Sequence, residues 1–203
     1  MRIGVDFDNT LVRYDDLFAR VCRERGLIGD DIPVDKTAIR DHLRAIGRED
    51  DWTEVQGIVY GPRITEAEAF DGALDVLREA AKVGHEIYII SHKTRHPYRG
   101  EKHDLHEAAQ NWLRTNGVIG ADGGVAAERA LFHERKEEKI ARIGEVGCDW
   151  FIDDLPEILG HELFPENVRR ILFDPGDAHA DDERWFRVGN WGGIRDFLQS
   201  EAR

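Results

Sequence analysis

Short apolar segments with high β propensity alternate with helical segments through most of this chain. Helical patterns separate the later strands, as in the apolar stripe over residues 70–83 that ends at Gly84. The predicted strands are residues 2–7, 85–91, 130–133, 149–152, 168–173 and 185–188. Such alternation is typical of a parallel sheet that helices cover on both faces. We therefore predict an α/β fold with three layers, α/β/α.

Residues 12–66 interrupt this alternation, because they lack strand character. Their apolar spacing predicts three helices, one ending at Gly26 and the others over about 34–46 and 51–59. We expect a core of residues 1–11 and 67–203, with 12–66 as a small helical insertion. Tyr14, Trp52 and Tyr60 of this insertion either stack on a ligand or form its small core, and the second use is the more common.

Composition excludes several classes of protein. The 203 residues carry a formal net charge of −13, which argues against a binder of nucleic-acid polymers. No apolar run approaches membrane length, so we expect no membrane partner. The two cysteines, Cys22 and Cys148, lie in apolar segments and suggest a reducing, cytoplasmic setting. The sequence leaves the oligomeric state open.

Four predicted strands end in residues that can perform chemistry. Two acids stand two residues apart at the first strand end, where an extended chain turns both side chains to one side. The residues at these strand ends are Asp6, Asp8, Ser91, Lys136, Asp153 and Asp154. In a parallel sheet the carboxyl ends of the strands form the usual ligand site. Four carboxylates and one ammonium in a cleft require a hard divalent cation, so the pattern predicts Mg²⁺ and a phosphoryl ligand.

In this order and spacing, the motifs resemble those of the haloacid dehalogenase-like (HAD) phosphohydrolase superfamily. The family pattern is Asp-x-Asp-x-Thr, a Ser or Thr after a strand, a Lys, and a paired acidic motif. Here the first motif reads Asp6-Phe7-Asp8-Asn9-Thr10. The resemblance covers most of the chain and implies a Rossmann-like core. It also implies that 12–66 is a cap, since many members carry their cap between motifs one and two.

The resemblance implies a role for each motif residue. Asp6 would be the nucleophile that forms an aspartyl-phosphate, and Asp8 the acid and base for the leaving group and the water. Ser91 would donate to a phosphoryl oxygen, and Lys136 would offset negative charge. Asp6, Asp153, Asp154 and the backbone carbonyl of Asp8 would hold the metal. Family members that displace halide lack an acid at the position of Asp8, so this residue favours phosphoryl chemistry.

Three assignments leave alternatives open. Lys139 lies three residues after Lys136 on nearly the same helix face, and we prefer Lys136 because it stands nearer the sheet edge. Thr94 is a lesser substitute for Ser91. Either Asp153 or Asp154 could be the direct metal ligand.

A basic segment follows the second motif directly. Between 92 and 106 it holds four histidines and four lysines or arginines against two acids, in a chain of negative net charge. This segment could steer an anionic substrate, or it could be a solvated loop. The candidate substrate-binding residues in it are His92, Lys93, Thr94 and Arg95.

Taken together, the motifs predict a hydrolase of phosphate monoesters that uses Mg²⁺ and an aspartyl-phosphate. Its partner would be a small phosphorylated metabolite, such as a nucleotide or a sugar phosphate. The alternatives are a phosphotransferase, a non-catalytic protein that binds a phosphorylated ligand, and a phosphoacceptor signalling protein. The motif order argues against the last, because receiver domains place their acidic pair first and their lysine last.

Overall fold

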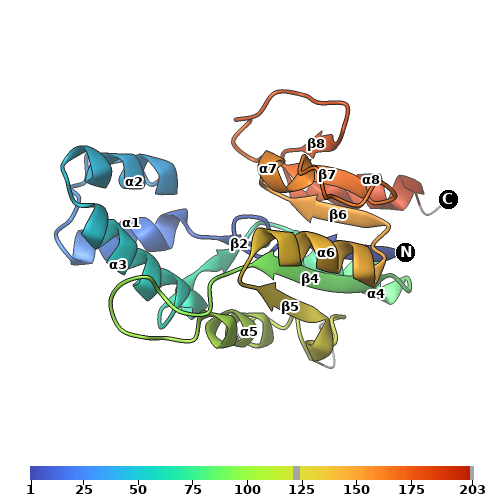
Figure 1. Cartoon of the computed structure of the whole chain (residues 1–203), viewed down its shortest axis with the longest axis horizontal. Coiled ribbons are helices and arrows are strands. Elements are labelled where there is room, and N and C mark those ends of the chain that lie inside the picture. The colour runs from blue at the N-terminus through green and yellow to red at the C-terminus, as the bar shows by residue number, and fades with distance from the viewer. Residues whose placement is uncertain (121–123, 202–203) are drawn as a thin grey trace. The chain divides into compact units, whose positions relative to one another are not determined.

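The chain contains a parallel six-stranded sheet, and the computed structural model describes residues 1–120 and 124–201 (Figure 1). The strand order is β5-β4-β1-β6-β7-β8. These strands are β1 (Arg2–Val5), β4 (Glu86–His92), β5 (Ala130–His133), β6 (Trp150–Asp153), β7 (Arg169–Phe173) and β8 (Phe186–Val188). Each neighbouring pair runs parallel, for example Val5 opposite Ile89 of β4 and Ile152 of β6. The first strand of the sequence is therefore central in the sheet.

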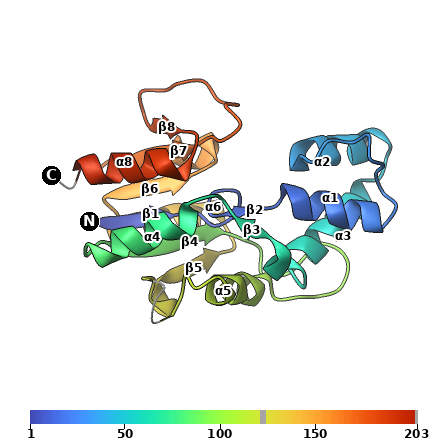
Figure 2. The same ribbon diagram turned by 180° about the vertical axis from the view of Figure 1, so that it is seen from behind.

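Helices cover both faces of this sheet. Helices α4 (Ala73–Lys82) and α8 (Trp191–Glu201) lie side by side on one face, and α6 (Lys136–Val146) lies on the other (Figures 1 and 2). The short α7 (Pro156–Leu159) follows β6 and was not predicted. The three-layer, Rossmann-like α/β prediction is confirmed.

The apolar alternation in the strands accounts for the burial of the sheet. Ile3, Val5, Ile87 and Ile89 are fully buried, as expected for strands that helices cover on both sides. Gly4 lies between two of them because β1 and β6 approach closely. A Cβ atom at Gly4 would lie 2.5 Å from the ring of Phe151. The centre of the sheet thus has no room for a larger residue there.

The described residues group into two compact units. The first contains the sheet and comprises Met1–Val12, Ala69–Lys93 and Asn116–Arg203; the second comprises Arg13–Glu68 and Thr94–Thr115. Two short strands, β2 (Val12–Arg13) and β3 (Glu68–Ala69), form a separate two-stranded sheet. Two 3₁₀ helices, η1 (Ile64–Glu66) and η2 (Ala127–Arg129), complete the elements.

The second unit is helical. It contains α1 (Asp15–Glu24), α2 (Lys36–Ala45), α3 (Glu49–Tyr60) and α5 (Leu105–Thr115). Tyr14 and Trp52 are buried, and Phe18 stacks on Trp52 with their ring centroids 4.9 Å apart. Tyr14 and Trp52 therefore form part of the small core of the unit, the more common of the two expected uses.

The grouping of α5 differs from the predicted boundaries, which assigned it to the core. This helix packs against η1 and α3, and Trp112 Nε1 donates a hydrogen bond to the carbonyl of Ala67 at 2.8 Å. Its apolar face is thus covered by the helical unit. The alternation of elements along the chain could not reveal this, because it does not say which surface a helix covers.

Within the residues that the structure describes, the helices are too short or too polar to span a membrane.

Candidate active site

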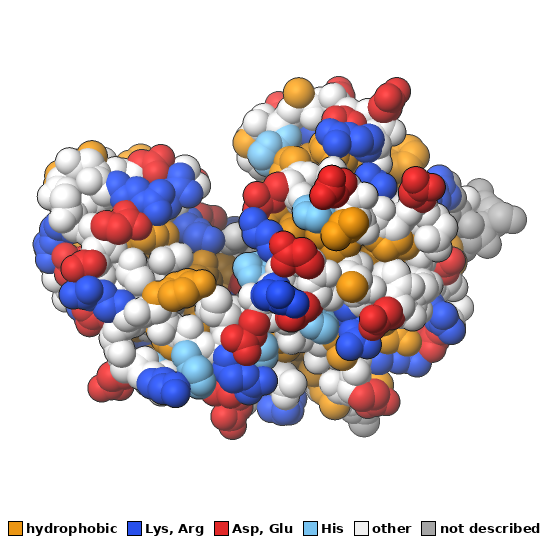
Figure 3. Space-filling view, in the orientation of Figure 1, with side chains coloured by type: hydrophobic (Ala, Val, Ile, Leu, Met, Phe, Trp, Pro, Cys, Tyr) orange, Lys and Arg blue, Asp and Glu red, His pale blue; other side chains and the backbone are white. Residues whose placement is uncertain are grey.

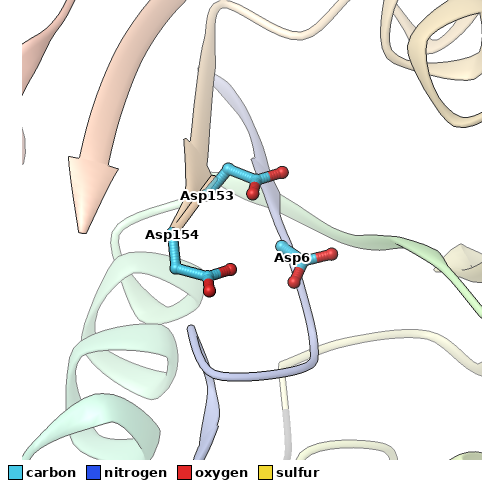
Figure 4. A group of neighbouring side chains, drawn as sticks. All are labelled: Asp6, Asp153 and Asp154. Carbon is cyan, nitrogen blue, oxygen red and sulfur yellow. The ribbon is translucent and has the colours of Figure 1, made fainter. Parts of the chain in front are cut away.

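Three carboxylates meet where β1 and β6 end. Asp6 directly follows β1, and its backbone N–H donates to the carbonyl of Ile152 at 2.9 Å. Asp153 ends β6 and Asp154 follows it. One carboxylate oxygen from each residue lies within 4.8 Å of the others, and Figure 4 shows all three side chains gathered at this edge. The parallel register of two neighbouring strands is therefore what assembles the cluster.

Lys139 neutralises part of this cluster. Its Nζ lies 2.6 Å from Asp6 Oδ1 and 2.6 Å from Asp153 Oδ2, and all three side chains are buried. Burial alone would lower the pKa of Lys139, but the carboxylates of Asp153 and Asp6 outweigh it and raise the pKa. Lys139 is therefore an ammonium group across the physiological range.

The ionised form of Asp6 remains unfavourable even with Lys139 beside it. Burial raises the pKa of Asp6 to about 6, Lys139 opposes the shift, and the charges of Asp153 and Asp8 add to it. The ionised form is thus costly without further positive charge. A cation at this position would favour the ionised form that nucleophilic chemistry requires.

The preference for Lys136 over Lys139 is wrong. Lys136 begins α6, its side chain is 42% exposed, and its Nζ pairs with Glu157 at 2.7 Å. Side chains on a helix lean toward its N-terminus, so a residue one turn inside the helix reaches back to the sheet edge. Lys136 itself already lies too far toward the start of the helix. The number of residues between a lysine and the strand end therefore does not tell which lysine reaches the carboxylates.

A second buried lysine holds Asp8. Lys93 Nζ lies 2.8 Å from Oδ1 and 2.7 Å from Oδ2 of this carboxylate. The sequence analysis places Lys93 among the substrate-binding candidates and does not predict this pair. One signal was available, because Ser91 and Lys93 are two residues apart in an extended segment and so point to the same side.

The charge balance of the site fits a divalent cation. Four carboxylates and two ammonium groups leave two negative charges. The available ligand atoms are carboxylate and carbonyl oxygens, which suit Mg²⁺.

Hydrogen bonds orient two of the carboxylates. Asp153 accepts one from Lys139 and, through Oδ1, one from the backbone N–H of Leu155 at 2.9 Å. Asp154 Oδ1 accepts from the hydroxyl of Thr10 at 3.3 Å. Asp6, Asp153 and Asp154 are thus the residues that could hold the metal.

Ser91 contributes a buried hydroxyl at the end of β4. It is 1% exposed, and among the residues that the structure describes its Oγ has no hydrogen-bond partner. Buried hydroxyls are normally paired, and an unpaired one indicates a missing ligand atom or water. This hydroxyl fits the predicted role of a donor to a phosphoryl oxygen.

The loop after Asp6 is held by a residue that is distant in sequence, Trp191. Asn9 adopts the left-handed conformation with φ 59°, which asparagine tolerates better than most residues. Thr10 is fully buried, and its carbonyl accepts a hydrogen bond of 3.1 Å from Trp191 Nε1 at the start of α8. The sequence analysis gives Thr10 as the last residue of the first motif and misses Trp191, because no local pattern connects the two.

The other candidate substrate-binding residues have separate contacts. His92 is half-buried, its ring donates to the carbonyl of Glu134 at 3.1 Å, and burial lowers its pKa. Thr94 and Arg95 belong to the second unit, where Arg95 pairs with Asp104 at 2.8 Å. In that unit Arg99 also pairs with Asp50. Part of the basic charge of residues 92–106 is therefore already neutralised.

On the face drawn in Figure 3, Lys and Arg side chains alternate with Asp and Glu side chains over the described residues.

Two curated bacterial proteins resemble this chain over much of its length. One from Oceanobacillus iheyensis is 22% identical over an alignment of 208 residues that covers 99% of this chain and 99% of the relative. One from Bacillus cereus is 27% identical over 168 residues, covering 78% of this chain and 79% of the relative. Both bear the name "Putative nucleotidase". No model of a known protein family matches the chain.

Solved structures of HAD-superfamily hydrolases share the fold over nearly the whole chain. One from Bacillus subtilis, bound to magnesium, aligns with a TM-score of 0.58 at 15% identity and covers 97% of each chain. Another from Deinococcus radiodurans, with bound phosphate and sodium, has a TM-score of 0.56 at 16% identity and covers 99% of this chain and 96% of its own. This chain therefore has the fold of the HAD-superfamily hydrolases, as its motifs predicted.

Proposed function

We propose that this protein is a Mg²⁺-dependent phosphomonoesterase that hydrolyses a small phosphorylated metabolite through an aspartyl-phosphate. The observation that carries the proposal is the environment of Asp6. Its carboxylate lies in an all-oxygen cluster, is oriented by Lys139 at 2.6 Å, and belongs to the same edge of the sheet as the buried hydroxyl of Ser91. An oriented nucleophile beside donors for phosphoryl oxygens is the arrangement that phosphoryl transfer requires.

The residues of the chain divide the reaction between them. A carboxylate oxygen of Asp6 attacks phosphorus while the ester P–O bond breaks, and Asp8 gives a proton to the leaving oxygen. A water then attacks the phosphorus of the aspartyl-phosphate, Asp8 takes its proton, and inorganic phosphate leaves with Asp6 restored. Lys139 and the hydroxyl of Ser91 offset charge on the transferring group. Mg²⁺, held by Asp6, Asp153, Asp154 and the backbone carbonyl of Asp8, would supply further charge neutralisation.

The relatives support a nucleotide as the first substrate class to test, because both curated proteins are named as nucleotidases. The bound magnesium and phosphate of two structural neighbours support the cofactor and the phosphoryl ligand. The helical unit, Arg13–Glu68 and Thr94–Thr115, contains the segment expected to be a cap, and this supports a small substrate. Cys22 and Cys148 are both buried and unlinked, which agrees with a reducing, cytoplasmic setting.

The direct test is phosphate release from nucleoside monophosphates, sugar phosphates and small phospho-acids. Each compound is incubated with Mg²⁺ and, separately, with a chelator, and the released alcohol is measured together with phosphate. We expect release only with Mg²⁺ and equal amounts of the two products. An excess of alcohol over phosphate would instead indicate transfer to an acceptor other than water. Binding of inorganic phosphate without hydrolysis of any compound would favour a binding protein.

Replacing Ser91 by alanine should lower kcat/KM about 10- to 100-fold, since one hydrogen bond to a charged oxygen is lost. The Tm should stay the same or rise, because the change removes a buried hydroxyl that lacks a protein partner. Steady-state kinetics and thermal unfolding check both parts. Ser200→Ala, at an exposed serine of α8, is the matched control. Unchanged kcat/KM in Ser91→Ala would contradict the assigned role.

Stabilisation of the protein by Mg²⁺ should depend on pH through Asp6. Its pKa is raised from 3.8 to about 6 in the metal-free fold, so the fold favours the proton. This contribution to stability is complete below about pH 4 and is lost as the pH rises through 6. Mg²⁺ binds the ionised form and replaces the lost proton. The rise in Tm on adding Mg²⁺ should therefore be small at about pH 5 and reach its plateau above about pH 7. An equal rise under both conditions would refute this linkage.

A further inference from the structure

Lys93 is more deeply buried than Asp8, the acid that it contacts. Its Nζ binds both carboxylate oxygens, at 2.8 and 2.7 Å. The side chain of Lys93 is 3% exposed, whereas that of Asp8 is 21% exposed. Of the two groups, the carboxylate of Asp8 is therefore the more accessible to a ligand. This geometry suits a residue that supports Asp8 better than one that receives the substrate.

Lys93 is held in place both at its backbone and at the end of its side chain. Its backbone N–H donates to the carbonyl of His133 at 2.8 Å, which continues the pairing of β4 with β5 by one residue. At the other end, Nζ lies 5.6 Å from the ring centroid of Phe7, within the range of a cation–π contact. A buried ammonium anchored in this way holds its partner in one orientation, because leaving either charge unpaired would be costly.

The two acids of the first motif thus have separate lysines. Lys139 binds Asp6, the proposed nucleophile, and Lys93 binds Asp8, the proposed proton donor. We infer that Lys93 is a positioning residue that aims the carboxyl group of Asp8 at the leaving oxygen. This inference rests on the proposed function and adds a residue to it. Lys93 keeps its hydrogen bond to one oxygen of Asp8 while the other oxygen carries the proton that is transferred.

The experiment compares two phosphate esters whose leaving groups differ in how much they need protonation. The p-nitrophenolate of p-nitrophenyl phosphate leaves readily as an anion, whereas the alkoxide of a nucleoside 5′-monophosphate needs the proton from Asp8. The value of kcat/KM, which reports the first chemical step, is measured for both esters. The variants are Lys93→Met, Asp8→Asn and the double variant. Lys136→Met, at an exposed lysine, is the matched control, and thermal unfolding establishes that each variant is folded.

In Lys93→Met we expect kcat/KM to fall about 100-fold for the nucleoside monophosphate and less than about 5-fold for the aryl ester. Adding Lys93→Met to Asp8→Asn should cause little further loss, since the lysine acts through the acid. Equal losses for both esters, or losses that add fully in the double variant, would overturn the inference and indicate direct substrate binding. If the unaltered protein hydrolyses neither these esters nor any compound of the wider panel with Mg²⁺, the proposed function fails. An active parent protein with equal losses for both esters in Lys93→Met refutes the inference alone, so the two failures are distinguishable.

Discussion

Exchanging Asp6 for asparagine should lower kcat for phosphate release by at least about 10⁴-fold. An amide nitrogen or oxygen cannot replace the carboxylate that attacks phosphorus and later regenerates. The fold should persist, because the amide oxygen of asparagine can still accept from Lys139, which also keeps Asp153 as a partner. Phosphate release from the preferred substrate with Mg²⁺ is the measurement.

The same variant should be at least as stable as the parent protein in metal-free buffer at about pH 7.5. Burial raises the pKa of Asp6 to about 6, so the ionised side chain at this pH opposes folding. The neutral amide of the variant would remove that charge. Asp75→Asn, at an exposed aspartate of α4 that pairs with Arg78, is the matched control and should keep full activity. A large drop in Tm for Asp6→Asn, or residual activity near that of the parent, would contradict this account of the site.

Exchanging Lys139 for methionine should cost both activity and stability. The buried carboxylates of Asp6 and Asp153 would lose the ammonium group that both contact at 2.6 Å. Removing one partner of a buried ion pair typically costs about 3–5 kcal/mol. For a protein of this size that corresponds to a Tm about 10 °C lower. Thermal unfolding in metal-free buffer, together with phosphate release, measures the two effects.

Lys136→Met is the critical comparison for this prediction. Its ammonium group pairs with Glu157 at an exposed position, and such pairs contribute about 0–1 kcal/mol. The variant should therefore keep a Tm within a few degrees of the parent and activity within about twofold. If Lys136→Met were the inactive variant and Lys139→Met the active one, the lysine of the site would have been misassigned.

Much of the fold was predictable because it depends on patterns that are local in sequence. Apolar residues such as Ile3, Val5, Ile87 and Ile89 occupy short segments between helices, and this spacing permits few alternatives to a parallel sheet. Strand ends could be predicted for the same reason, which located Asp6, Ser91 and Asp153 correctly. The grouping of α5 with the helical unit could not, because helix periodicity identifies an apolar face and not the surface that covers it.

The contacts of the site that the sequence did not predict depend on how far a side chain extends and where its end lies. Lys136 and Lys139 are less than one helical turn apart, and this small difference in position along α6 separates the buried partner of Asp6 from a lysine in a surface ion pair. Lys93 carries the charge expected of a phosphate ligand, and only three-dimensional geometry reveals that it contacts Asp8. Residue type and spacing thus identify a set of candidates, whereas their pairing is a property of the packed structure.

The bond between Trp191 and Thr10 has a consequence for how the protein is made. The two residues are 181 positions apart, and the indole of the last helix holds the loop that follows the first acid. The strands that flank β1 also come much later in the chain. During translation Asp6 and Asp8 are therefore made long before α8, and the hydrogen bond that holds their loop can form only after Trp191 has emerged. Premature termination before Trp191 would leave every acid of the site present and its supporting loop untethered.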